Sequence, residues 1–455
     1  MARAGAARGE IQMTEGSLWK NILIFSIPLV FSQLLQVMFN MADVAVVGKF
    51  ASDTALGSVG STSTLVTLFT GFLIGMGNGV NVRVAQHLGA QHREETSRAV
   101  HTAFLLCLLA GLGIMALCLA LAANMLEMLH TKDDLLPGAV LYFRIYALGM
   151  PALGVFNFGN AVLSANGDTK RPLLYLTIAG ILNVILNLFF VIVCKMAADG
   201  VALASVISQY VSAILVVWHM MRLNDACRFR FRELRFHGDE VGRILGLGVP
   251  AGIQHMIFAI ANLFIQAAVN SFDSTMVSGN AAAANTDTII YNIMMAFYTA
   301  CSTFMGQNWG AGHKKRMMDS YLISLFYAFA IAAVLGVAFY FAGRPFLYVF
   351  TNSADVVEAG MQRMKIMCFS YAISAFMDNT IAACRGLGRT IVPTVVVIMG
   401  SCVFRVIWVY TIFAHYHTIP SLYLLYAFSW TITAAAEIVY FLHCFRKLRL
   451  VPETA

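Results

Sequence analysis

Long apolar stretches, separated by short polar segments, follow one another along the whole chain. Two of them, 102–125 and 321–342, contain no Asp, Glu, Lys or Arg over roughly the 20 residues that a helix needs to cross a bilayer. The pattern predicts twelve membrane-spanning helices, near residues 22–48, 55–84, 99–123, 140–163, 173–196, 200–221, 243–271, 279–306, 320–342, 361–384, 393–414 and 421–444.

Composition supports an all-α polytopic membrane protein. Of the 455 residues, 59% are hydrophobic and only 12% are charged, which excludes an ordinary soluble domain. The first twenty residues are polar and lack the short apolar region of a signal peptide, so the first span is expected to stay in the mature protein.

Lys and Arg gather in alternate loops, which predicts the orientation. If there are twelve spans, about two-thirds of these residues lie on the side of the two termini, from Arg3 and Arg8 to Arg449. The positive-inside rule then predicts that both termini are cytoplasmic. The longest basic loop, 221–240, is expected to be a cytoplasmic linker facing anionic lipid, and nucleic acid is not an expected partner.

The second half of the chain repeats the first with an offset of 221 to 222 residues. Pro28 corresponds to Pro250, QHLGAQHR (86–93) to QNWGAGHK (307–314), and Gly167, Thr169 and Pro172 to Gly388, Thr390 and Pro393. Six spans per half is an even number, so both halves enter the membrane from the same side. Parallel repeats of this kind are typical of carriers.

These paired loops and three further segments resemble the multidrug and toxic compound extrusion (MATE) family along essentially the whole chain. The segments are 27–50, RGLGRTIVP (385–393) and GVALASVISQ (200–209), in which Ala and Ser replace the family's more usual Gly and Thr. The resemblance implies two six-helix bundles around a V-shaped central cavity, and export of lipophilic or cationic compounds in exchange for inward H⁺ or Na⁺. The expected parts are a tail 1–20, lobes 21–221 and 241–445, a linker 222–240 and a tail 446–455.

Polar residues inside the first-half spans are the main candidate site. A charged side chain at the bilayer centre costs about 2.5–3.5 kcal/mol on insertion scales, so each needs a partner or a role. Counting from the span ends places Asp43 in the outer half of the membrane, at the depth of other polar side chains. The predicted site for cation coupling and substrate comprises Asp43, Gln36, Asn40, Asn183, Asn187 and Ser205. Their oxygens could hold Na⁺, or Asp43 could carry a proton. Proton-coupled family members often have an acid where Asn187 stands, which puts a relay of two carboxylates in doubt.

The second half offers weaker candidates. Asp378 resembles an acid of the sodium-coupled branch and is added to the site, while Arg405 is as readily a structural partner of Asp378 or Glu437 as a coupling residue. The secondary candidates are His255, Asp287, Tyr291, Arg405 and Glu437. Lipophilic cations would suit aromatic and Met side chains, for which the candidates are Phe39, Tyr291, Met294, Met295, Phe297 and Tyr298, although each can equally be a packing residue.

The sequence therefore predicts a secondary active antiporter for drugs or xenobiotics, in the plasma membrane of a bacterium and functional as a monomer. No cofactor or structural metal is expected beyond the coupling ion, H⁺ or Na⁺. The alternative is a flippase for lipid-linked sugars or lipids of the same wider superfamily, which often has extra helices. No phosphate-binding loop, nucleophile motif or metal cluster indicates an enzyme or an ATP-driven pump.

Overall fold

In the computed structural model, which describes residues 11–448, every predicted span is helical and these residues form no strand. The first eight helices are α1 (Leu18–Phe50), α2 (Asp53–Gly89), α3 (Arg93–Met128), α4 (Leu136–Ala147), α5 (Met150–Ala165), α6 (Lys170–Leu188), α7 (Ala198–Met221) and α8 (Gly238–Val269). Then follow α9 (Ser274–Gly310), α10 (Lys314–Leu347), α11 (Ala354–Gly386), α12 (Ile391–Val397), α13 (Phe404–Trp408), α14 (Ala414–Tyr416) and α15 (Ile419–Lys447). Arg3, Arg8 and Arg449 of the predicted charge pattern lie outside the described residues.

Eleven helical segments of the described chain are long and apolar enough to cross a membrane, and the bent pair α4 and α5 makes a twelfth. This confirms the predicted all-α fold with about twelve spans. The predicted span 140–163 is bent by 44° where α4 gives way to α5. Pro151 lies in the first turn of α5 and has no backbone N–H for a preceding helical turn, which accounts for a break at this place.

Contacts divide the chain into two units, which are described separately. Of the described residues, the N-terminal unit holds 11 and 31–256, and the C-terminal unit holds 12–30 and 257–448. Thus α1 and α8 each contribute to both units, whereas the lobes predicted from the repeat, 21–221 and 241–445, keep each helix whole. Those lobe limits stay a prediction.

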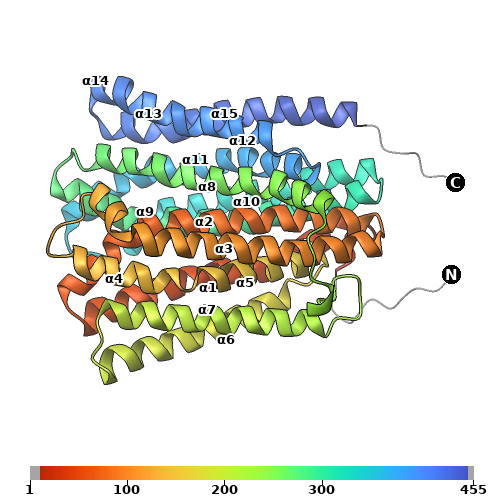
Figure 1. Cartoon of the computed structure of the whole chain (residues 1–455). Helices are drawn as coiled ribbons and strands as arrows, with labels where there is room; N and C mark the ends of the chain where they lie inside the picture. The colour runs from red at the N-terminus through yellow and green to blue at the C-terminus, as the bar shows by residue number, and fades with distance from the viewer. Residues whose placement is uncertain (1–10, 449–455) are drawn as a thin grey trace. The chain divides into compact units, whose positions relative to one another are not determined.

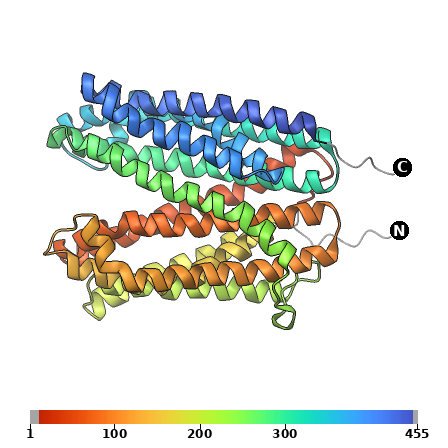
Figure 2. The same cartoon turned by 45° about the horizontal axis from the view of Figure 1, so that its top comes forward.

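Helices of each unit lie side by side (Figures 1 and 2). In the N-terminal unit, α2 packs against α3, α4 and α5, and α7 packs against α4, α5 and α6. In the C-terminal unit, α9, α10 and α11 pack against one another, and α15 packs against α11 and the α12–α13 region. Two short π-helical segments, Ile398–Val403 and Val409–Phe413, interrupt the span 391–416, and one, Phe189–Val193, follows α6.

The repeat is visible in the ends of the helices. Helices α2 and α9 are both 37 residues long, and their first residues are 221 apart (274 − 53 = 221). The side chains of Ser52 and Asp273 cap them, each by accepting the backbone N–H of the residue three positions along. Gly167 and Gly388, also 221 apart, both have positive φ values, 90° and 77°. Such φ values are readily adopted only by glycine, which explains both glycines of the paired loops.

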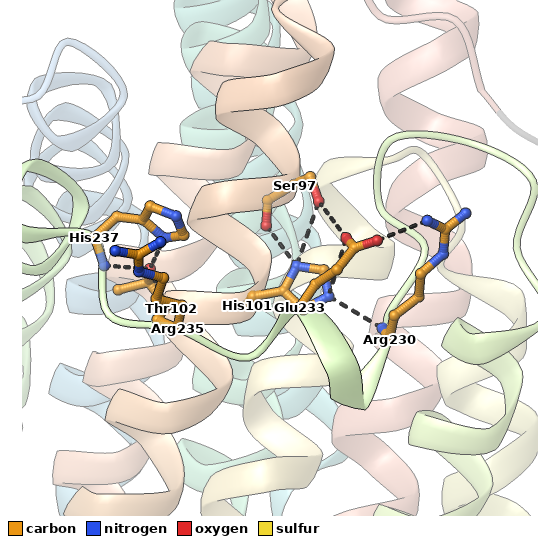
Figure 3. Close-up of polar contacts among 7 residues, drawn as sticks. All are labelled: Ser97, His101, Thr102, Arg230, Glu233, Arg235 and His237. Atoms are coloured by element: carbon orange, nitrogen blue, oxygen red, sulfur yellow. Dashed lines mark hydrogen bonds and ion pairs between the residues drawn. The ribbon is translucent and has the colours of Figure 1, made fainter.

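The basic linker is folded onto the N-terminal end of α3 rather than extended (Figure 3). His101, which is buried, accepts the backbone N–H of Arg230 on Nε2 at 3.0 Å, and its ring stacks on Phe229. Thr102 binds the backbone N–H of His237 at 3.3 Å. Glu233 accepts a hydrogen bond from Arg230 at 2.6 Å, which lowers the pKa of that carboxyl.

The linker ends at a buried ion pair. Arg83 of α2 binds Glu240 through two hydrogen bonds of 2.8 and 2.7 Å, and Nε2 of His87 lies 3.0 Å from the same carboxylate. Helix α8 therefore begins at Gly238, before the predicted start at residue 243. A carboxylate in the first turn also suits the positive end of the helix dipole, so Glu240 contributes to this earlier start in two ways.

Candidate functional site

Four predicted residues from three helices meet around the carboxylate of Asp43. Asn187 of α6 donates a hydrogen bond to Asp43 Oδ1, and Ser205 of α7 donates one to Oδ2 at 3.4 Å. Asn183 donates to Ser205 Oγ at 3.3 Å and accepts from Asn187 at 3.2 Å. The result is a closed polar network inside the N-terminal unit. We call these four residues the Asp43 network.

Local sequence explains how α6 supplies two of its members. Asn183 and Asn187 are four residues apart and therefore lie on one face of the helix, which is buried. One turn earlier, the ring of Phe39 from α1 fills the space that a side chain at Gly180 would need. Glycine thus lets α1 approach α6. The π-helical segment begins at Phe189, directly after Asn187, and such segments are frequent at functional sites.

The four residues of the Asp43 network differ in their exposure to solvent. Asn183, Asn187 and Ser205 are buried, whereas Asp43 is partly exposed. Two tyrosines, Tyr142 and Tyr146, stack with ring centroids 6.0 Å apart and lie close enough to interact electrostatically with Asp43. The sequence analysis missed them, although two tyrosines four residues apart in an apolar span are a signal that could have found them.

Gln36 and Asn40, the other predicted residues of the first span, lie outside the Asp43 network. Both side chains are exposed, and no hydrogen bond joins either to the network within residues 11–448. A shared helical face placed them near Asp43 in the sequence analysis. That face extends over several turns of α1, and only the turn of Asp43 meets α6 and α7 with its polar side chain.

The network has the chemistry of a small-cation site. It offers carboxylate, amide and hydroxyl oxygens, which hard cations such as Na⁺ and a proton both prefer. The Oδ1 atom of Asn187 is buried and accepts no hydrogen bond from the described residues. A buried amide oxygen without a donor is costly, so it is a fitting ligand for an incoming cation. Among these residues, no group of three or more His, Cys, Asp or Glu could hold a metal ion.

Asp287 has a structural partner that the sequence analysis missed. Arg363 of α11 donates hydrogen bonds to Asp287 and to Asn280, both on α9, and Tyr423 of α15 also donates to Asn280. All four side chains are buried. Arg363 stands near the start of the predicted span 361–384, where a basic residue resembles an ordinary span end. Only the packing of three helices shows that it is buried.

Arg405 lies among aromatic rings and makes no ion pair within the described chain. Its guanidinium lies 4.5 Å from the ring centroid of Tyr426 and 5.4 Å from that of Trp430, and Nε donates to Ser429 Oγ at 3.1 Å. The alternative that Arg405 directly pairs with Asp378 or Glu437 is therefore wrong. Arg405 makes cation–π contacts in place of an ion pair with a carboxylate. The rings come from Tyr426 and Trp430, which lie one turn apart on α15.

The remaining second-half candidates do not form one site. Asp378 is partly buried and feels the charges of Arg385 and Arg405, while Arg385 donates a hydrogen bond to Tyr298 OH. Tyr291 is 39% exposed and interacts electrostatically with Asp378. Among residues 11–448, no neutral side chain donates a hydrogen bond to Asp378, in contrast to Asp43.

The other candidates lie at separate places in the two units, most of them packed against neighbouring helices. His255 packs against Gly71 of α2, within the N-terminal unit. Glu437 is fully buried on α15. The buried members of the predicted aromatic and Met lining belong to the core of the C-terminal unit, namely Met294, Phe297 and Tyr298, while Phe39 and Met295 are partly buried.

Comparison with known proteins agrees with the repeat and the fold. The MatE family model matches residues 28–189 and 250–411, two copies that begin 222 residues apart (250 − 28 = 222). The chain is similar to the Bacillus subtilis protein named "Probable multidrug resistance protein YpnP", with 28% identity over 79% of this chain and 80% of that one. It is also similar to a Shewanella oneidensis protein named "FAD transporter", with 23% identity over 74% and 75% of the two chains.

A solved structure has the same fold over nearly the whole length. It is described as the outward-facing conformation of a multidrug resistance MATE family transporter of the MOP superfamily. The match has a TM-score of 0.90 at 20% identity and covers 97% of this chain and 99% of that one. The predicted two-bundle transporter fold is thereby confirmed.

Proposed function

Because the chain belongs to the MatE family of membrane transporters, we propose that it is a secondary active antiporter that exports lipophilic or cationic drugs in exchange for inward H⁺ or Na⁺. The family consists of transporters, so the chain is a transporter and not an enzyme. The drug class rests on the names of relatives such as YpnP. The ion exchange rests on the Asp43 network.

The observation that carries the proposal is the arrangement around Asp43. Its carboxylate is held by neutral donors, Asn187 and Ser205, and no Arg or Lys forms an ion pair with it among the described residues. A carboxylate in this position keeps its negative charge available to a mobile cation. The buried Oδ1 of Asn187 supplies a further oxygen that lacks a donor. An acid already neutralised by arginine, such as Asp287, would not serve in this way.

Binding of a cation there can drive export if it favours one facing of the transporter over the other. One positive charge moving inward supplies about 2.3 kcal/mol per 100 mV, and a tenfold ion gradient adds about 1.4 kcal/mol. Together they would support uphill export of a neutral drug by several hundredfold at most. We further propose a location in the bacterial plasma membrane, with both termini cytoplasmic because the basic loops lie on their side.

Efflux of ethidium from liposomes containing the purified protein tests this function, with proton and sodium gradients imposed separately. We expect Asp43→Asn to lose the component of wild-type efflux that is driven by the ion bound at the Asp43 network. Asp355→Asn, the same change at an exposed acid of α11, is the matched control and should transport like the wild type.

Two results would change the proposal. If neither gradient moves ethidium or any other lipophilic cation, the drug antiporter is rejected. FAD serves as a second substrate because one relative bears that name. Movement of FAD without movement of cations would keep the transporter and replace its substrate class. Transport that persists in Asp43→Asn with unchanged gradient dependence would remove the Asp43 network from the mechanism.

A further inference from the structure

Four acidic residues are buried in the described chain, and one of them differs from the other three. Asp168 binds Arg171 at 3.0 Å, Glu240 binds Arg83 at 2.7 Å, and Asp287 binds Arg363. Glu437 is 0% exposed, and neither of its carboxyl oxygens has a hydrogen-bond partner among the described residues. It is thus a buried acid without the partner that the others have.

The position of Glu437 on α15 excludes a lipid-facing or water-facing side chain. Ser429, Thr433, Glu437 and Phe441 follow one another at four-residue spacing and are all buried, so they form one inward face. This helix packs against α11 and against the π-helical segment Ile398–Val403. Glu437 is close enough to Cys384 and Arg385, at the end of α11, to interact with them electrostatically.

Polar groups along this face are occupied with one another. The hydroxyl of Thr433 donates to Ser429 O at 2.7 Å and also lies 3.1 Å from Ser401 Oγ. One turn beyond Glu437, the ring of Phe441 packs on Tyr321, with centroids 4.7 Å apart. The hydroxyl of Tyr321 is in turn hydrogen-bonded to Thr380 at 2.9 Å. The hydroxyls of this face thus bind elsewhere, and none of them donates to Glu437 among the described residues.

An ionised carboxylate in such surroundings is far less stable than a neutral carboxylic acid. Removing an unpaired charge from water costs several kcal/mol even after relaxation, and the group normally becomes neutral instead. For a carboxylate the way to become neutral is to form an O–H bond with a proton from the aqueous side. Within residues 11–448, no side chain forms a hydrogen bond with the Glu437 carboxyl group.

We propose that Glu437 is a proton-binding site of the C-terminal unit, protonated in this conformation and deprotonated in the other main conformation of the transport cycle. Arg385 supplies the alternative partner. It now donates to Tyr298 OH, and its charge already acts on Glu437. Rearrangement at the end of α11 that brings Arg385 or water to Glu437 would stabilise the carboxylate and release the proton.

The site selects a proton over Na⁺. A sodium ion needs several oxygen ligands, and the hydroxyls nearest in the sequence and packing of this face already bind one another. A proton needs a single carboxyl oxygen. Only the link to drug export rests on the proposed function, whereas the protonation state of Glu437 is a property of the protein itself.

Infrared spectroscopy of the purified protein at neutral pH tests the protonation state directly. We expect the C=O absorption of a protonated carboxylic acid in the wild type and its loss in Glu437→Gln. Glu358→Gln, the same change at an exposed, ion-paired acid of α11, should leave that absorption unchanged. Glu437→Asp should shift the C=O absorption to another frequency. This variant replaces Glu437→Gln if the glutamine variant does not fold. If Glu437→Gln instead loses the absorption of an ionised carboxylate and keeps every acid C=O absorption, Glu437 is deprotonated in the wild type and the proposal is overturned.

Transport stoichiometry tests the role of the proton. In liposomes, the proton gradient that just balances a known substrate gradient gives the number of protons exchanged per substrate. We expect Glu437→Gln to exchange one proton fewer than the wild type, and an unchanged number would overturn the coupling role. If the wild type transports nothing, the proposed function fails, and the infrared result still decides whether Glu437 binds a proton.

Discussion

The two units of this transporter share a frame but treat their acidic residues in different ways. In the N-terminal unit, Asp43 is partly exposed and is held by the neutral donors Asn187 and Ser205. In the C-terminal unit, Asp287 is neutralised by Arg363, and Glu437 is buried without a hydrogen-bond partner in the described part of the chain. The repeat preserved helix lengths, caps and loop glycines but not the polar residues inside the spans. The two units therefore have similar helices but different polar residues, so they can have different functions in transport.

The largest effect on stability is expected from the ion pair of the C-terminal unit. In Asp287→Asn, Arg363 stays buried and charged, and removing one partner of a buried pair costs about 3–5 kcal/mol. Thermal unfolding in detergent should show a much lower midpoint. Glu358→Gln, at the exposed pair with Arg344, is the control and should cost about 1 kcal/mol or less. Similar midpoints for the two variants would contradict a structural role of Asp287.

A smaller effect is expected in the N-terminal unit. Asn187→Ala removes the hydrogen bond to Asp43, and a hydrogen bond to a charged group contributes about 1.5–3 kcal/mol. The variant also lacks the Oδ1 atom that would bind the cation, and losing about 1.5 kcal/mol of that contact raises the ion concentration for half-maximal transport about tenfold. Ion-dependent efflux at a fixed ethidium gradient measures this shift. Asn40→Ala, at an exposed position outside the network, should leave the ion dependence of transport unchanged. An equal shift in both variants would show that Asn40 also belongs to the ion site.

The smallest effect is expected at the linker. The hydrogen bond from Arg230 lowers the pKa of Glu233, so the folded state favours the carboxylate. Its stabilisation is present above the ordinary pKa of a glutamic acid and is lost as the pH falls through the lowered value. Because both side chains are exposed and screened by water, the contribution is about 0–1 kcal/mol.

Amide hydrogen exchange over residues 229–237 measures that contribution. Exchange should quicken slightly in Glu233→Gln at neutral pH, and the difference from the wild type should vanish in acid. Slower exchange in the variant would show that the carboxylate strains the linker.

Tertiary contacts explain which of the predicted site residues lie together in the structure. Asp43, Asn183, Asn187 and Ser205 were predicted together because estimated depth and helical spacing placed them at one level, and the structure joins them. Gln36 and Asn40 satisfied the same sequence criteria, but their turns of α1 do not meet the polar face of α6. The estimated depth of a side chain in the membrane limits which residues can contact Asp43. The packing of the helices then decides which of those residues do.

By itself, the sequence determined the membrane-spanning helices, the internal repeat and the acid at the first-half site. It could do so because the thickness of the bilayer demands a length of apolar residues, and because caps and loop glycines act locally. Only the tertiary structure decided that Arg363 neutralises Asp287, that aromatic rings surround Arg405, and that no residue within 11–448 is hydrogen-bonded to the Glu437 carboxyl group. Asp287 and Arg363 are 76 residues apart, and a contact over such a separation depends on which helix faces meet, which no local pattern specifies.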